Sequence, residues 1–228
     1  MRRRDPFNRR PGEKPVGGEQ WNLYDHWRRS SARTSFGMFE SIQPIVLVGG
    51  QSLRFGRDKL REPINREGSE WLVDRPIAAL RALFGPRVAL VGQCDAAVSV
   101  RADVVIPDRY PGVGPAGGVL AALEQSTGDV FVLAGDLSRI TSNSIGAILD
   151  AALAPTAPAV SAWVVLAKAN GVQPCIGLYR QAVRPLLAER IGQGRRSLYD
   201  LVPADRLLLV SIDVAEATNV NTPDALEQ

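Results

Sequence analysis

The chain of 228 residues is poor in histidine and cysteine: it has one histidine, His26, and two cysteines, Cys94 and Cys175. Because residues 41–228 contain no histidine, that part cannot form a Ser-His-Asp triad or a zinc site with four Cys and His ligands that include histidine. Two cysteines are more typical of small buried side chains than of a disulfide framework, which favours a reducing, cytoplasmic location. Any chemistry must therefore rely on Asp, Arg, Lys and backbone groups.

The sequence also lacks a long apolar run and a uniform excess of charge. No stretch approaches the roughly 18 apolar residues of a membrane span. The net charge of +3 comes from residues 1–40, which hold nine of the 27 Lys and Arg and five of the 24 Asp and Glu, so the rest carries 18 against 19. We therefore expect neither nucleic acid nor a membrane as a partner of the folded part.

Residues 1–40 are predicted to be a disordered basic tail. They contain clusters of Pro, Gly, Arg and Ser without sustained periodicity, a composition that cannot bury enough apolar surface to offset its ordering entropy. They also lack the apolar core of a secretory signal. A basic arm that contacts RNA or a membrane is one alternative, and translation from Met38 is another. Residues 41–228 are expected to form one folded domain.

Apolar runs bounded by Gly and Pro alternate with segments of helical spacing along that domain. They predict strands at 45–48, 87–92, 103–107, 129–136, 159–167, 170–180 and 206–212, and helices from about Pro76 to 84 and at 115–126, 142–153, 181–191 and 195–202. This alternation predicts an α/β fold, a three-layer sandwich around a mostly parallel sheet.

The stretch GGQSLRFGRDK, residues 49–59, follows a strand that is predicted to be buried on both faces. Ligands bind at the carboxyl ends of such strands, where glycine amides and basic side chains suit a phosphate. The stretch is not a P-loop, because Gly50 and Gly56 are separated by five residues, and adjacent Gly49 and Gly50 do not fit the dinucleotide fingerprint. An ordinary turn with solvated basic residues is the alternative.

Two further segments carry candidate functional residues. In PDRYPGVGPAGG, residues 107–118, Asp108 follows a strand and four glycines surround a helix start. The segment either holds a nucleobase and ribose, with Asp108 as hydrogen-bond acceptor, or is a connector whose glycines permit close packing. Asp136 ends the apolar strand VFVLAGD, where a carboxylate is costly to bury unless it is paired or metal-bound. Metal ligation is favoured there over a helix N-cap.

Six motifs together resemble those of the molybdenum cofactor guanylyltransferases, which belong to the wider nucleotidyltransferases with a Rossmann-like, glycosyltransferase-A-like fold. The resemblance runs from about Pro44 to Leu226, and the motifs are LVGGQSLRFGRDK, VGPAGGVLAAL, VLAGDLS, QPCIGLYR, GQGRRSL and NVNTPDAL. It implies that residues 41–228 are a nucleotidyltransferase domain.

The resemblance also implies a reaction and a set of site residues. The reaction is transfer of GMP from GTP to molybdopterin, the molybdenum cofactor, with Mg²⁺ as cofactor; contact with a molybdoenzyme or its chaperone is a further expectation. Arg54, Lys59 and Asp136 correspond to catalytic residues, with Asp136 as the metal ligand. The nucleotide-binding positions are Leu47, Val48, Gly49, Gly50, Ser52, Lys59, Gln93, Asp108, Gly114 and Asp136.

Two departures from the family pattern bear on the acceptor. Residues 60–75, LREPINREGSEWLVDR, are longer and more charged than the family's short link after the lysine, and Ala134 and Gly135 replace the usual pair before the metal aspartate. Three other functions fit the same motifs: a cytidylyltransferase for the same pterin, a nucleotidyltransferase for another phosphorylated acceptor, and a non-catalytic nucleotide-binding adaptor for molybdoenzymes.

Overall fold

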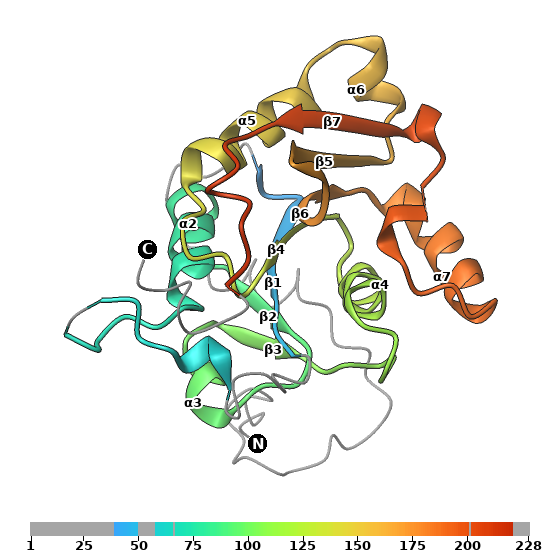
Figure 1. Ribbon diagram of the computed structural model, residues 1–228. Coiled ribbons are helices and arrows are strands. Elements are labelled where there is room, and N and C mark those ends of the chain that lie inside the picture. Colours follow the sequence, from blue (N-terminus) through green and yellow to red (C-terminus); the bar gives the residue numbers. More distant parts are fainter. Residues whose placement is uncertain (1–38, 50–57, 66, 201, 221–228) are drawn as a thin grey trace, which may run out of the picture.

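The computed structural model describes residues 39–49, 58–65, 67–200 and 202–220, which fold around a seven-stranded sheet (Figure 1). The strand order is β3-β2-β1-β4-β6-β5-β7, and β6 alone runs antiparallel to both of its neighbours. The strands are β1 Ile42–Leu47, β2 Ala89–Val91, β3 Val104–Ile106, β4 Asp129–Ala134, β5 Val164–Ala169, β6 Gly171–Tyr179 and β7 Leu207–Ser211. The predicted mostly parallel α/β sheet is confirmed.

The helices begin where the sequence provides caps or proline. They are α2 Asp74–Phe84, α3 Ala96–Ser99, α4 Pro115–Gln125, α5 Ser142–Leu153, α6 Ala157–Ser161 and α7 Arg184–Gly192, with 3₁₀ turns η2 Lys59–Arg61, η3 Gln181–Val183, η4 Leu198–Asp200 and η5 Ala204–Arg206. Proline opens α4, where its missing N–H costs nothing, and the Thr141 hydroxyl accepts a hydrogen bond from the Ser144 N–H at the start of α5.

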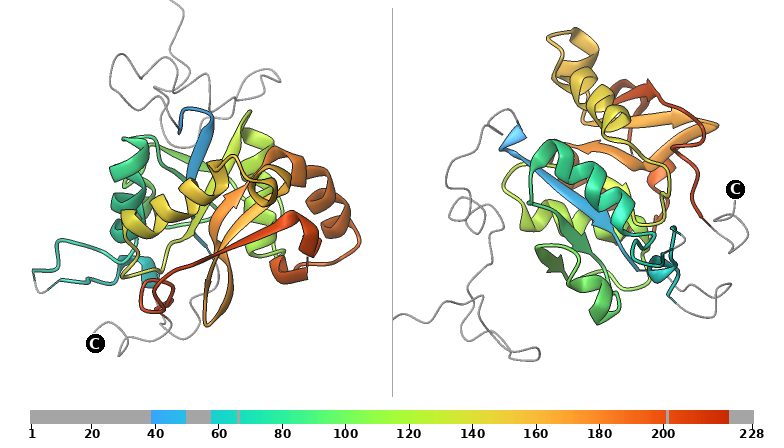
Figure 2. Two further views of the ribbon diagram at one scale, coloured as in Figure 1. Left: turned by 90° about the horizontal axis from the view of Figure 1, so that it is seen from above. Right: turned by 90° about the vertical axis from the view of Figure 1, so that its left-hand side faces the viewer.

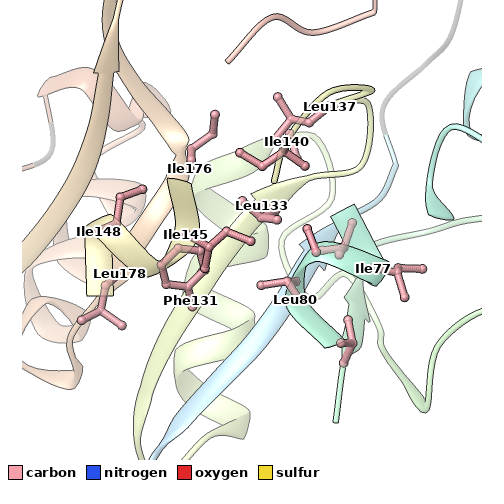
Figure 3. Packing of buried hydrophobic residues seen from close by; sticks show 14 of the residues in the cluster. Ile77, Leu80, Phe131, Leu133, Leu137, Ile140, Ile145, Ile148, Ile176 and Leu178 are labelled. Carbon is pink, nitrogen blue, oxygen red and sulfur yellow. The ribbon is translucent and has the colours of Figure 1, made fainter. Parts of the chain in front are cut away.

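Helices cover both faces of the sheet, which makes the predicted three layers (Figure 2). Alternate residues of β4 point to opposite faces: Phe131 and Leu133 pack with α2 and α5, whereas Val130 and Val132 belong to the cluster that includes α4 and α7. Figure 3 shows the first of these clusters, with Phe131 between the two helices. The continuous apolar run of β4 follows from this two-sided burial.

Two predicted elements were wrong in part. The strand expected at 159–167 begins only at Val164, because its first residues belong to α6, which Thr156 and Pro158 initiate as cap and first-turn residues. The helix expected at 195–202 is only the short turn η4 Leu198–Asp200. In both places a short apolar pattern could not reveal the local chain reversal, and tertiary packing decided it.

The predicted tail, residues 1–40, lies almost entirely outside the described residues and stays a prediction. In the described part, no helix has the length and apolarity needed to cross a membrane.

The carboxyl ends of β1 and β2 meet closely because of Gly92. Its φ is +121°, and a Cβ added there would lie 1.8 Å from the carbonyl oxygen of Val48. The Val48 N–H donates to the Val91 carbonyl at 2.9 Å, so the two strand ends are held together at this point. A side chain at position 92 would force them apart.

We predict that Gly92→Ala lowers the free energy of unfolding by at least about 2 kcal/mol, through its positive φ and the overlap with the Val48 carbonyl. Gly146→Ala is the matched control, because Gly146 lies inside α5 with open space around its Cα. That control should gain about 0.5–1 kcal/mol from helix propensity. Urea unfolding of both variants measures the two changes, and a Gly92→Ala midpoint equal to the wild-type value would contradict the argument.

Candidate active site

The predicted site residues lie along one edge of the sheet, at the carboxyl ends of four adjacent parallel strands. Gly49 follows β1, Gln93 follows β2, Asp108 follows β3 and Asp136 follows β4. The connections reverse direction on either side of β1, which is the switch point where open α/β sheets bind ligands. The Gly135 N–H donates to the Leu47 carbonyl at 3.0 Å, so the β4 loop lies directly against the end of β1.

Lys59 is held at this edge by a short anchored turn. The Asp58 carboxylate accepts a hydrogen bond from the Leu60 N–H at 3.0 Å, and the Leu60 side chain is buried in the core. This arrangement fixes the backbone at Lys59 and leaves its long side chain free to reach inward. The Lys59 ammonium lies 2.5 Å from Oδ2 of Asp136 and donates to the Val220 carbonyl at 3.4 Å.

Asp136 is a buried carboxylate, with 8% of the residue exposed. It does not cap the following helix, because α5 begins at Ser142 and Thr141 is its N-cap. The alternative that Asp136 serves as a helix cap is therefore wrong. The chain near the carboxyl terminus returns to this point (Figure 1): the Val220 N–H donates to the Asp136 carbonyl at 2.9 Å, and Leu137 forms a β-bridge with Asn219.

The loop after β3 is tied to α4 and to the GQGRRSL segment. Oδ1 of Asp108 accepts a hydrogen bond from the Tyr110 N–H at 2.8 Å, and the Tyr110 hydroxyl donates to Glu124 at 2.6 Å. Burial and the carboxylate of Glu124 raise the pKa of Tyr110 to about 12. The Arg196 guanidinium donates to the Gly112 carbonyl at 3.1 Å. Within the described residues, no hydrogen bond or ion pair links Asp108 to the Lys59–Asp136 pair.

The glycines of this loop divide between the two predicted roles. Gly117 and Gly118 are buried, and a Cβ on either would lie 2.8 Å from a neighbouring side chain, Tyr110 or Leu47 respectively. Close packing explains those two. Gly114, the N-cap residue of α4, is exposed and has nothing within 4 Å of an added Cβ, so packing does not account for it.

The long link after Lys59 forms a projecting hairpin at the same edge (Figure 1). Pro63 and Trp71 form an antiparallel bridge at its base. The Arg101 guanidinium stacks 4.0 Å over the Trp71 ring and pairs with Asp74 at 2.8 Å. Stacking and pairing together fasten the hairpin to the segment after α3.

Three of the predicted site residues, Gly50, Ser52 and Arg54, lie outside the described residues. The motif reasoning missed the contact with the backbone of Val220 and the position of Cys175. Nothing in the letters NVN indicates which carbonyl meets a lysine 161 positions away. The pairing of Lys59 with Asp136 was also missed, because both were assigned to the same nucleotide and not to each other.

Asp136 offers a magnesium ion one carboxylate and no more. Among the described residues there is no cluster of three or more His, Cys, Asp or Glu that could hold a metal. Mg²⁺ in nucleotide enzymes is commonly held by one or two carboxylates together with substrate phosphates and water. The donor chemistry therefore fits a cation that is coordinated jointly by Asp136 and a nucleotide, and the ammonium of Lys59 is a stand-in cation at that carboxylate.

Comparisons with known sequences identify relatives of this chain. The family model for the MobA-like NTP transferase domain matches residues 44–207. A protein of Opitutus terrae named "Probable molybdenum cofactor guanylyltransferase" is 30% identical over 168 residues, which are 72% of this chain and 79% of the relative. A protein of the same name from Chloroflexus aggregans is 28% identical over 192 residues, 80% of this chain and 90% of the relative.

Solved structures share the fold. The protein Aq1419 of Aquifex aeolicus VF5 has a TM-score of 0.64 at 25% identity, covering 80% of this chain and 94% of its own. Molybdopterin-guanine dinucleotide biosynthesis protein A of Archaeoglobus fulgidus has a TM-score of 0.60 at 23% identity, with coverages of 81% and 94%. These likenesses agree with the Rossmann-like α/β architecture.

Cys175 provides a test of the electrostatics around Asp136. Burial and, secondarily, the charge of Asp136 raise the pKa of the Cys175 thiol to about 12. At pH 8 in EDTA, we expect alkylation of Cys175 by iodoacetamide to be slower by roughly 100-fold in the folded protein than in the urea-unfolded chain. Peptide mass spectrometry distinguishes it from Cys94, and equal rates in the two states would contradict the burial of a neutral thiol.

The same shift fixes the sign of a pH effect on stability. The folded protein keeps the Cys175 proton at pH values where the unfolded chain loses it, so this group's contribution is complete below about pH 9 and is lost as the pH rises toward about 12. Cys175→Ala should therefore show a shallower alkaline loss of stability than the wild type.

Proposed function

The chain belongs to the MobA-like NTP transferase family, and from that premise we propose that it transfers GMP from GTP to the phosphate of molybdopterin. An oxygen of the acceptor phosphate forms a bond to the α-phosphorus of GTP, and the bond between the α-phosphorus and the bridging oxygen breaks. The electron pair leaves on pyrophosphate. The observation that carries the proposal is the Lys59–Asp136 pair at the carboxyl edge of the central strands.

This reaction needs no histidine. The second pKa of a phosphomonoester is near ~6, so the acceptor is largely a dianion at neutral pH and needs no general base. Aligning two anions and offsetting their charge is then the main catalytic task. The absence of histidine from residues 41–228 is consistent with that chemistry.

Each residue has a distinct role in the proposed complex. Lys59 neutralises charge on the triphosphate, and the backbone at Gly49 approaches it closely. Asp108 and the exposed Gly114 flank the nucleobase and ribose. Asp136 would hold Mg²⁺, which when bound offsets charge on the nucleotide phosphates.

Three other functions remain distinguishable by experiment. The fold alone does not choose among them, because a cytidylyltransferase of Anaerococcus prevotii, 4-diphosphocytidyl-2C-methyl-D-erythritol synthase, has a TM-score of 0.59 at 10% identity. A different phosphorylated acceptor would change the carboxyl-terminal half of the site. An adaptor that contacts a molybdoenzyme or its chaperone would not need the buried pair of Lys59 and Asp136.

We expect purified protein with Mg²⁺, molybdopterin and each labelled NTP in turn to transfer label from GTP, and to bind GTP more tightly than CTP, ATP or UTP. The G-P-A-G-G sequence at 114–118 favours guanine through its likeness to the guanine-using branch. Tighter binding of CTP would replace the guanylyl assignment with the cytidylyl one. Nucleotide binding without any transfer would favour the adaptor.

Lys59 and Asp136 should respond differently to metal, since one acts on the nucleotide directly and the other through Mg²⁺. Lys59→Ala is expected to lose about 100-fold or more in turnover, with no recovery at high Mg²⁺, because the lost charge belonged to the protein. Asp136→Ala should lose activity sharply and regain part of it at high Mg²⁺ or Mn²⁺. Titrating turnover with Mg²⁺ measures both responses.

Asp150→Ala is a suitable control for that titration, because Asp150 is exposed in the second half of α5. It should keep wild-type turnover and metal dependence. Wild-type metal dependence in Asp136→Ala would show that the carboxylate does not act through a cation.

A further inference from the structure

The buried carboxylate of Asp136 has the ammonium of Lys59 as its ion-pair partner among the described residues. A carboxylate with 8% of its residue exposed needs a compensating charge, because an isolated ionised group in such a place is strongly disfavoured. The distance of 2.5 Å from Nζ to Oδ2 places the ammonium directly on the carboxylate. The protein alone therefore already carries the counter-ion that this site requires.

We propose that Lys59 occupies the cation position on Asp136 in the nucleotide-free protein, so that a divalent cation binds there only together with a nucleotide. The inference rests on the proposed function in one respect, that the nucleotide's phosphates attract Lys59. A divalent cation on Oδ2 would have to displace the ammonium, and one on the other carboxylate oxygen would lie beside it and be repelled. Ammonium and metal are therefore competitors.

The turn that carries Lys59 allows this exchange without unfolding. The backbone is fixed by the Asp58 cap and by buried Leu60, so only the flexible four-carbon side chain has to move. A triphosphate offers the ammonium more negative charge than one carboxylate does. Once the ammonium leaves, Asp136 is again an uncompensated buried carboxylate, which favours a cation arriving with the same phosphates.

The experiment measures Mn²⁺ binding to the full-length, nucleotide-free protein by the electron paramagnetic resonance signal of free Mn²⁺. We expect weak binding by the wild type and at least about ten-fold tighter binding by Lys59→Met, which keeps the side-chain length and removes the charge. Lys59→Arg should stay as weak as the wild type. Adding Asp136→Asn to Lys59→Met should abolish the gain.

Lys168→Met is the matched control, because Lys168 is an exposed lysine at the end of β5 and has no ion pair with Asp136 among the described residues. It should bind Mn²⁺ as weakly as the wild type. Equal Mn²⁺ affinity in the wild type and Lys59→Met would overturn the inference, and so would an equal gain in Lys168→Met.

Removal of Lys59 leaves a buried charge, so folding needs a separate readout. Thermal unfolding provides it: Mn²⁺ alone should raise the melting temperature of Lys59→Met and leave that of the wild type unchanged. A variant that melts lower without Mn²⁺ and recovers with it supports the inference, and no recovery contradicts it. GMP transfer by the wild type is scored independently, so failed transfer with a positive Mn²⁺ result overturns the proposed function and leaves the competition standing.

Discussion

The burial of one carboxylate governs the organisation of this site. Asp136 ends a strand whose other residues are apolar and enclosed on both faces, so it leaves the sheet in a place that water barely reaches. A positive charge must accompany it, and the chain supplies one from Lys59, 77 positions earlier. The turn of Asp58 and Leu60, the strand end at Leu47 and the returning segment at Val220 all surround that pair.

The parallel sheet makes such a meeting unavoidable. Because β3, β2, β1 and β4 run in the same direction, the loops that follow them open on one edge, and residues that are remote in sequence become neighbours there. Gly92 lets the first two of these loops approach within van der Waals distance. The β5–β6 hairpin and the chain after β7 reach the same edge, which brings Cys175 and Val220 close to Asp136.

The site combines a rigid base with side chains that can exchange partners. Its base consists of strand ends, a capped turn and a backbone bridge between Leu137 and Asn219. Lys59 differs from these, because its ammonium is held by charge and not by packing. A nucleotide that brings its own charge can therefore rearrange the site locally while the seven-stranded sheet stays as it is.

The sequence by itself determined the α/β class, most of the strands and the candidate residues, because buried parallel strands are continuous apolar runs and Asp136 stands at the end of one. It misjudged residues 159–163, where a cap and a proline start α6 before the strand begins. Only the tertiary structure decided that Lys59 and Asp136 touch, that Thr141 and not Asp136 caps α5, and that Val220 closes the site. The physical reason is that these contacts join segments far apart along the chain, and their distances depend on strand order, which no local pattern of residues contains.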